Sequence, residues 1–105
     1  MLMLDDNALT SLPASVGELS ALKLLSCNSN RVASLPASIG ALSALEALEL
    51  NGNALTVLPD AMAALTALEA LDLEENPLVS PQSVVIEAWL QGLRESGCDV
   101  LLDAE

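Results

Sequence analysis

The 105-residue sequence contains no histidine, phenylalanine or tyrosine, and its single tryptophan is Trp89. Histidine is the side chain that most often acts as a general base or metal ligand near neutral pH, and it is missing. The two cysteines cannot complete a tetrahedral zinc site, which needs three or four nitrogen or sulfur ligands. We therefore expect no metal, no cofactor and no enzyme activity.

Basic residues are also scarce: three lysines and arginines stand against fifteen acids, giving a net charge of −12. Nucleic acid and anionic membrane surfaces would be repelled by such a chain. A protein partner with a basic surface fits the charge better. The same charge also keeps a chain rich in alanine and leucine soluble without any partner, so that interpretation stays open.

What the chain has in abundance is leucine, with 24 residues, and alanine, with 16. Four asparagines, Asn7, Asn30, Asn53 and Asn76, stand 23 residues apart, and the same pattern returns around each. A fixed period of this length is typical of a solenoid, in which each repeat buries its apolar face against its neighbours. Around Asn53 the pattern reads Leu45-x-x-Leu48-x-Leu50-x-x-Asn53-x-Leu55-x-x-Leu58-Pro59.

Each repeat combines two spacings. The alternation in Leu48-x-Leu50 predicts a short strand, and Met62-x-x-Leu65-x-x-Leu68 has helical spacing. Gly17 and Gly40 weaken two of the helical segments, which favours short 3₁₀ turns over longer α-helices. The four asparagines follow the strands, where buried amides can bond to the backbone of adjacent coils. We predict core amides rather than a ligand or ion site.

The pattern resembles the leucine-rich repeats of about 23 residues with a Leu-Pro signature, as in Ras-suppressor-like proteins and plant intracellular Ras-group proteins. The resemblance covers residues 1 to 79 and extends into Asn76-Pro77-Leu78-Val79-Ser80-Pro81. It implies an α/β solenoid, with short parallel strands on the concave face and helical or 3₁₀ segments on the convex face. It also implies an intracellular scaffold that binds a protein partner through its concave strands.

The cysteines agree with an intracellular, cytoplasmic location. Cys27 stands at the frame position that leucine fills in the other repeats, and Cys98 lies far along the chain, so a disulfide between them is not expected. The opening segment, residues 1–6, is too short and too acidic for a signal peptide. No apolar run approaches the roughly 20 residues of a membrane span.

The two ends differ from the regular repeats. The first of about four repeats lacks its opening leucine, so we expect its apolar layer and strand edge to be exposed. This predicts self-association or poor order near residues 1–9, and it raises the possibility of a fragment of a longer repeat protein.

Residues 80–105 are predicted to form a C-terminal capping helix and tail after the repeats of residues 1–79. Ser80 is expected to cap a helix that starts at Pro81 and stops near Gly97. Residues 100–102 are expected to form a closing strand. Trp89 is predicted to cover the last layer; its alternative is a binding anchor. The apolar stripe of the helix is predicted to contain Val84, Val85, Ala88, Trp89 and Leu93.

The strand residues between the leucines should face the concave side and align in columns. Eight of the fifteen acids fall on or beside this surface, and the columns become more acidic toward the C-terminus. We predict that this face binds a basic protein surface. One alternative is a purely structural C-terminal portion of a longer array or large assembly; another, weaker one is an acid–base pair of Glu49 and Asp72 on adjacent strands. The predicted partner-binding residues are Asp5, Asp6, Asn28, Glu49, Asn51, Asp72, Glu74 and Glu75.

Overall fold

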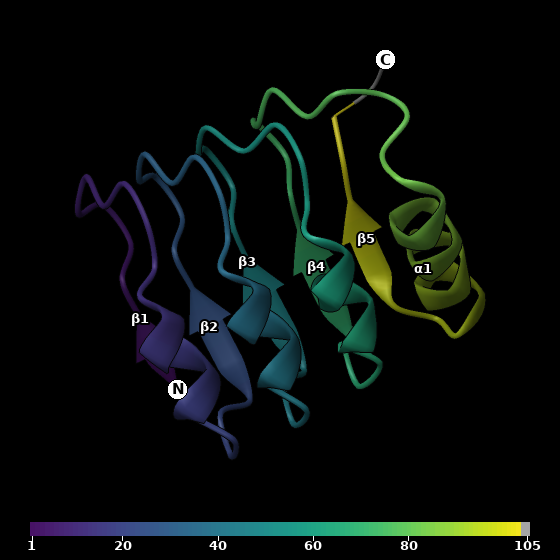
Figure 1. The fold of residues 1–105 in the computed structure, drawn as a ribbon, viewed down its shortest axis with the longest axis horizontal. Helices are drawn as coiled ribbons and strands as arrows, with labels where there is room; N and C mark the ends of the chain where they lie inside the picture. The colour runs from purple at the N-terminus through teal and green to yellow at the C-terminus, as the bar shows by residue number, and fades with distance from the viewer. Residues whose placement is uncertain (104–105) are drawn as a thin grey trace.

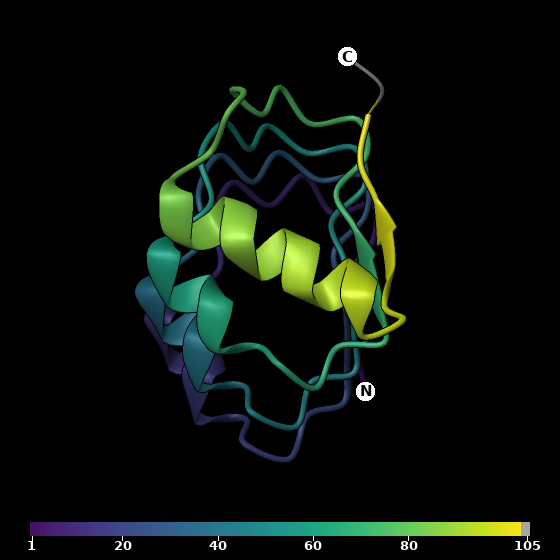
Figure 2. The same ribbon diagram turned by 90° about the vertical axis from the view of Figure 1, so that its right-hand side faces the viewer.

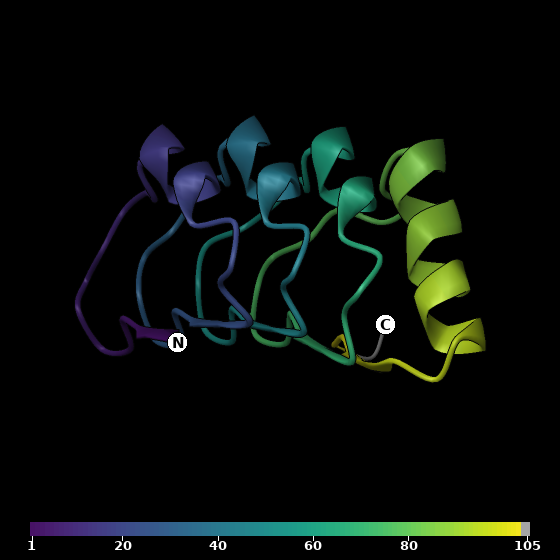
Figure 3. The same ribbon diagram turned by 90° about the horizontal axis from the view of Figure 1, so that it is seen from below.

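The computed structural model describes residues 1–103, which form a stack of coils. Figure 1 shows five parallel strands side by side in sequence order. The helical segments lie along the opposite side of the stack, as Figure 3 shows from below. The strands are β1 (Leu2–Met3), β2 (Leu24–Ser26), β3 (Ala47–Glu49), β4 (Ala70–Asp72) and β5 (Asp99–Leu101).

Three 3₁₀ helices connect the first four strands, and an α-helix precedes the fifth. Prolines 13, 36 and 59 stand directly before the 3₁₀ helices, in an extended conformation. The predicted solenoid of strands and short helical turns is confirmed. The connecting helices are η1 (Ala14–Glu18), η2 (Ala37–Ala41), η3 (Asp60–Ala64) and α1 (Val84–Glu95).

The strand register stacks equivalent leucines directly on one another. Leu25 aligns with Leu48, and Leu48 aligns with Leu71. All three are fully buried. Burying a leucine side chain stabilises the folded state by about 1.5–3 kcal/mol, so layers of leucine account for most of the core.

The asparagines connect consecutive coils through their side-chain amides. Asn76 Nδ2 donates to Leu73 O in its own coil (3.0 Å) and to Leu50 O in the preceding coil (2.8 Å). Its Oδ1 accepts the N–H of Leu55 at 3.1 Å. Asn30 and Asn76 are buried and Asn53 is half-buried with the same pattern of bonds. The prediction of core amides is confirmed for these three.

Asn7 is the exception, and the prediction of a buried amide is wrong there. Its side chain is exposed, and Nδ2 donates only within its own coil, to Leu4 O and Asp5 O. The reason is geometric: the other asparagines donate to the residue just after the strand of the preceding coil, and the described residues include no coil before β1.

The glycines of the 3₁₀ helices have a second role that the sequence did not indicate. A Cβ atom at Gly40 would lie 2.2 Å from Ala61 O, and one at Gly17 would lie 2.6 Å from Ser38 O. Such separations are impossible without movement of the backbone. Glycine therefore allows η1, η2 and η3 to stack closely on the convex side.

The capping helix starts three residues later than predicted. Its N-cap is Ser83, whose Oγ accepts the N–H of Ile86 at 3.1 Å, so the prediction of Ser80 as cap and Pro81 as first residue is wrong. The coil continues through Gln82, which binds Leu58 N–H through Oε1 (2.9 Å) and Thr56 O through Nε2 (3.1 Å). These bonds hold the chain in the stack until residue 83.

The buried stripe of α1 also differs from the prediction. Val84, Val85 and Ala88 are exposed, because the face that meets the last coil follows the i, i+3, i+4, i+7 spacing that starts at Ile86. Trp89 is buried as predicted, and its Nε1 donates to Leu65 O at 3.0 Å, so it caps the solenoid. The helix ends at Glu95 before Gly97, and the closing strand is confirmed as β5. The buried residues of the helix are Ile86, Trp89, Leu90 and Leu93.

Both cysteines are free and buried. Burial raises the pKa of the Cys27 thiol to about 11, and the nearby Asp5 carboxylate adds to the rise. Burial also raises the pKa of Cys98, with Asp99 and Glu69 contributing. Both thiols are therefore protonated near neutral pH, which makes them packing groups rather than nucleophiles.

The close stacking at Gly40 predicts a clear contrast between two glycine substitutions. Gly40→Ala should lower the free energy of unfolding by about 2 kcal/mol, because the methyl group meets the Ala61 carbonyl. Gly92→Ala in α1 should instead raise it by about 1 kcal/mol, since its Cβ meets no atom within 4 Å and alanine favours helix. Urea denaturation measures both; equal stability of the two variants would contradict the stacking argument.

Candidate functional site: the concave face

The strand register aligns the concave side chains in columns, as the sequence predicted. Met3, Ser26 and Glu49 follow one another across β1, β2 and β3. Asp72 and Leu101 continue the same column on β4 and β5. The column thus changes from apolar and neutral at the N-terminal end to acidic at β3 and β4.

At the N-terminal end, Asp5 is part of the coil-to-coil bonding. Its Oδ1 accepts the Ser26 hydroxyl and the Asn28 N–H, both at 2.7 Å. Asn28 Oδ1 in turn accepts the N–H of Asn51 at 2.8 Å. Ser26 is buried beneath this network. The predicted site residues Asp5, Asn28 and Asn51 therefore serve the structure first, and Asp5 has one oxygen already occupied.

The middle of the face holds Glu49 and Asp72, both half-buried. Glu49 Oε1 accepts Asn28 Nδ2 at 3.1 Å, and Asp72 Oδ2 lies 3.5 Å from Asn51 Nδ2. The other Asp72 oxygen accepts the N–H of Glu74 at 3.0 Å. The two asparagine amides thus orient both carboxylates on the surface. Because the amides are neutral, they do not cancel the negative charge of the carboxylates.

In the described residues, the carboxylates of three other predicted site residues are not held by hydrogen bonds, unlike those of Glu49 and Asp72. Asp6 and Glu75 are exposed and Glu74 is half-buried. Within residues 1–103, none of these three carboxylates accepts a hydrogen bond. They are free to meet a partner, and Glu74 and Glu75 stand beside Asp72 at the C-terminal end of the face.

The fifth strand and the segment after it add two acids to the concave face beside the Glu49–Asp72 column, which the sequence did not reveal. Asp99 pairs with Ala70 across β4 and β5, and Asp103 Oδ1 accepts the N–H of Glu75 at 2.8 Å. Asp99 and Asp103 are both exposed. The 23-residue period missed them because α1 lengthens this last unit. The only signal in the sequence is that Asp99 and Asp103 flank the apolar residues 100–102.

The chain's own bases do not neutralise this surface. Among residues 1–103, none of Lys23, Arg31 and Arg94 forms an ion pair. The concave acids therefore keep a net negative potential, which favours a cationic surface.

The geometry does not support the alternative that Glu49 and Asp72 form a catalytic acid–base pair. Glu49 and Asp72 are adjacent in register, but each is bound to an asparagine amide on an open face. In the described part of the chain, no group of three or more His, Cys, Asp or Glu residues is placed to hold a metal. No helix within residues 1–103 is long and apolar enough to cross a membrane.

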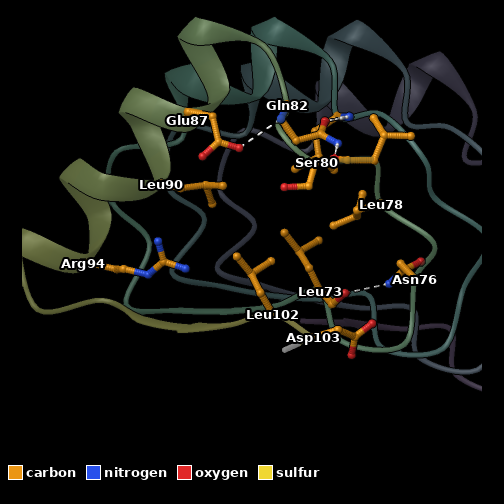
Figure 4. Close-up of a pocket in the computed structure, with 12 residues that line it drawn as sticks. Leu73, Asn76, Leu78, Ser80, Gln82, Glu87, Leu90, Arg94, Leu102 and Asp103 are labelled. Atoms are coloured by element: carbon orange, nitrogen blue, oxygen red, sulfur yellow. Dashed lines mark hydrogen bonds between the residues drawn. The ribbon is translucent and has the colours of Figure 1, made fainter. Parts of the chain in front are cut away.

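A cavity of about 440 Å³ lies at the C-terminal end of the stack and meets this face at Asp103. Figure 4 shows its lining side chains, which come from the last coil, from α1 and from the segment after β5. Leucines form much of the wall, and Glu87, Arg94 and Asp103 are the charged groups. No pattern in the sequence predicted this cavity.

Comparison with known proteins agrees with the architecture. A family model described as a leucine-rich repeat region matches residues 1–96. No curated protein matches the chain. A solved structure of a leucine-rich repeat protein from Leptospira interrogans is 34% identical in sequence, with a TM-score of 0.75.

That match covers 87% of this chain and 22% of the Leptospira chain, so this chain spans about a fifth of its structural neighbour. Leucine-rich repeat folds are generally protein-interaction modules and are typically scaffolds rather than enzymes. The 23-residue frame, the asparagine ladder and the match over residues 1–96 place the chain in the family of leucine-rich repeat proteins.

Proposed function

We propose that the concave face binds a protein partner with a basic surface. The observation that carries the proposal is the gathering of Glu49, Asp72, Glu74 and Glu75 on β3, β4 and the turn that follows, with no base paired to them within residues 1–103. Such a surface speeds encounter with a cationic partner and disfavours anionic ones. Nucleic acids and anionic membranes are accordingly not expected partners.

The hydrogen bonds at this face support its use for recognition. Asn28 and Asn51 bind Glu49 and Asp72, so these carboxylates are oriented before a partner arrives. Orientation before binding reduces the entropy lost on association. We further propose that the module has no catalytic activity of its own and acts inside the cell, in keeping with two buried, protonated thiols.

A second role, self-association or docking to further repeats, is supported by the first coil. Leu2 and Leu4 are only half-buried, whereas Leu48 and Leu50 at the same positions of β3 are fully buried. Strand β1 is also an edge of the sheet, with unpaired backbone groups on its outer side. This role suits the structural alternative, in which the chain is part of a longer array or assembly.

A charge-reversal experiment tests the concave-face proposal. The double variant Glu49→Lys, Glu74→Lys should weaken binding of the partner, recovered by affinity purification from a lysate, by about tenfold or more. The matched control Glu18→Lys, Glu95→Lys has the same net charge but changes two exposed residues of η1 and α1. It should bind like the original chain. A role for the concave charges would be contradicted if both variants lost binding equally, or if neither variant lost binding.

Sedimentation velocity over a range of concentrations tests self-association. The apparent mass should rise above the monomer mass of 10.8 kDa as concentration rises. The reason is that association buries the half-buried leucines of the first coil against a second copy. Adding a charge by Leu2→Lys should shift the equilibrium to monomer. A concentration-independent monomer whose Leu2 and Leu4 amides exchange slowly would rule this role out.

A further inference from the structure

The cavity at the C-terminal end lies where the regular stacking stops. Figure 2 shows α1 crossing the end of the solenoid diagonally, below the loops of the coils. In the earlier coils this space is filled by the next repeat. Here it is bounded instead by one helix and by the segment after β5, which leaves about 440 Å³. This volume is within the usual range of small-molecule sites.

One wall of the cavity has a backbone donor that lost its partner when the repeats ended. Val32 N–H donates to Asn53 Oδ1 in the next coil, and Leu55 N–H donates to Asn76 Oδ1. Leu78 holds the equivalent position in the last coil and lines the cavity. No acceptor for its N–H is found within residues 1–103. By analogy with Leu55, this donor points beyond the last coil.

The opposite side of the cavity carries a free positive charge. Figure 4 shows Arg94 from α1 on one side, and Leu78 and Asn76 on the other. Of the three charged groups, Glu87 accepts the Gln82 N–H at 3.0 Å and Asp103 accepts the Glu75 N–H at 2.8 Å. The Arg94 guanidinium has no partner within residues 1–103. Among the charged groups that line the cavity in the described chain, it is the one hydrogen-bond donor, and all of its N–H groups are available to an acceptor.

Half of the twelve residues that line the cavity are apolar: five leucines and Val79. Leu73, Leu90 and Leu102 lie between Arg94 and Leu78 in Figure 4. An occupant that satisfies the whole cavity needs a carboxylate at one end, an aliphatic middle, and an oxygen acceptor at the other. An uncharged oxygen suits the far end better than a second carboxylate, because Glu87 and Asp103 already add negative charge.

We propose that this cavity binds a medium-chain aliphatic carboxylate that carries a hydroxyl or carbonyl oxygen at its far end. The carboxylate pairs with Arg94, the methylene chain packs on the leucines, and the distal oxygen accepts the Leu78 N–H. Arginine is suited to the first contact because its planar guanidinium matches a carboxylate with two parallel hydrogen bonds. The site adjoins the concave face at Asp103, which belongs to both, but its occupant is bound by Arg94 and Leu78 and does not require a partner on that face.

Three probes of equal chain length separate the contributions: 8-hydroxyoctanoate, octanoate and 1,8-octanediol. In titrations followed by NMR, 8-hydroxyoctanoate should bind best and shift the Leu78 amide resonance downfield. Octanoate should bind several-fold more weakly without that shift, because it lacks the acceptor for Leu78. The diol should bind at least about tenfold more weakly than the hydroxy acid, since it cannot pair with Arg94.

Substitution of the arginine gives the decisive comparison. Arg94→Gln should reduce binding of 8-hydroxyoctanoate at least about tenfold, to the level of the diol. Arg31→Gln makes the same charge change at an exposed residue of the second coil and should have no effect. Arg94 is exposed, so its variant should fold, and thermal unfolding checks this. Equal binding of hydroxy acid and diol, equal effects of the two variants, or no binding of any probe would overturn the proposal.

Discussion

The structure depends on the side-chain amides of the asparagines, which bind each coil to the one before it. Each buried amide donates to carbonyls just after the strands of two coils and accepts an N–H from the preceding return segment, as Asn76 does with Leu50, Leu73 and Leu55. These backbone groups have no strand or helix to satisfy them, and leaving one buried and unpaired costs about 1–3 kcal/mol. The ladder therefore sets the 23-residue register, and the leucine layers and concave columns follow from it.

The two surfaces with functional potential differ in their relation to this ladder. The concave face exists because the register holds: Glu49 and Asp72 come side by side only when Leu48 aligns with Leu71. The terminal cavity exists because the register ends. There, α1 replaces the next coil, no further asparagine meets Leu78, and leucines that would be stacked inside the solenoid line a hollow instead. One repeat unit thus produces a recognition surface along its length and a different site at its end.

The parts of the fold that repeat were predictable from the sequence. Residues 23 positions apart have equivalent neighbours in the stack, so the sequence period also predicts which residues are buried. Leucine layers, 3₁₀ turns and the asparagine amides belong to this group, and so does the alignment of the concave acids. The incorrect predictions concern the two ends of the stack, where a residue does not have the same neighbouring coils as its equivalents in the middle. Asn7 is exposed for lack of a preceding strand, and α1 starts late because Gln82 continues the coil with bonds to Leu58 and Thr56. The concave acids of the fifth strand were missed because the helix interrupts the period, and no pattern in the sequence indicated the cavity.

The most direct test of the ladder compares the unfolding free energies of Asn53→Asp and Asn7→Asp by chemical denaturation. Asn53 Nδ2 donates to Cys27 O and Leu50 O, and aspartate would place a negative charge against both carbonyls. Asn7→Asp is the same chemical change at an exposed residue whose side chain bonds only within its own coil. We predict a loss of about 3 kcal/mol or more at Asn53 and a change within about 0.5 kcal/mol at Asn7. Equal, small losses at both positions would contradict the account.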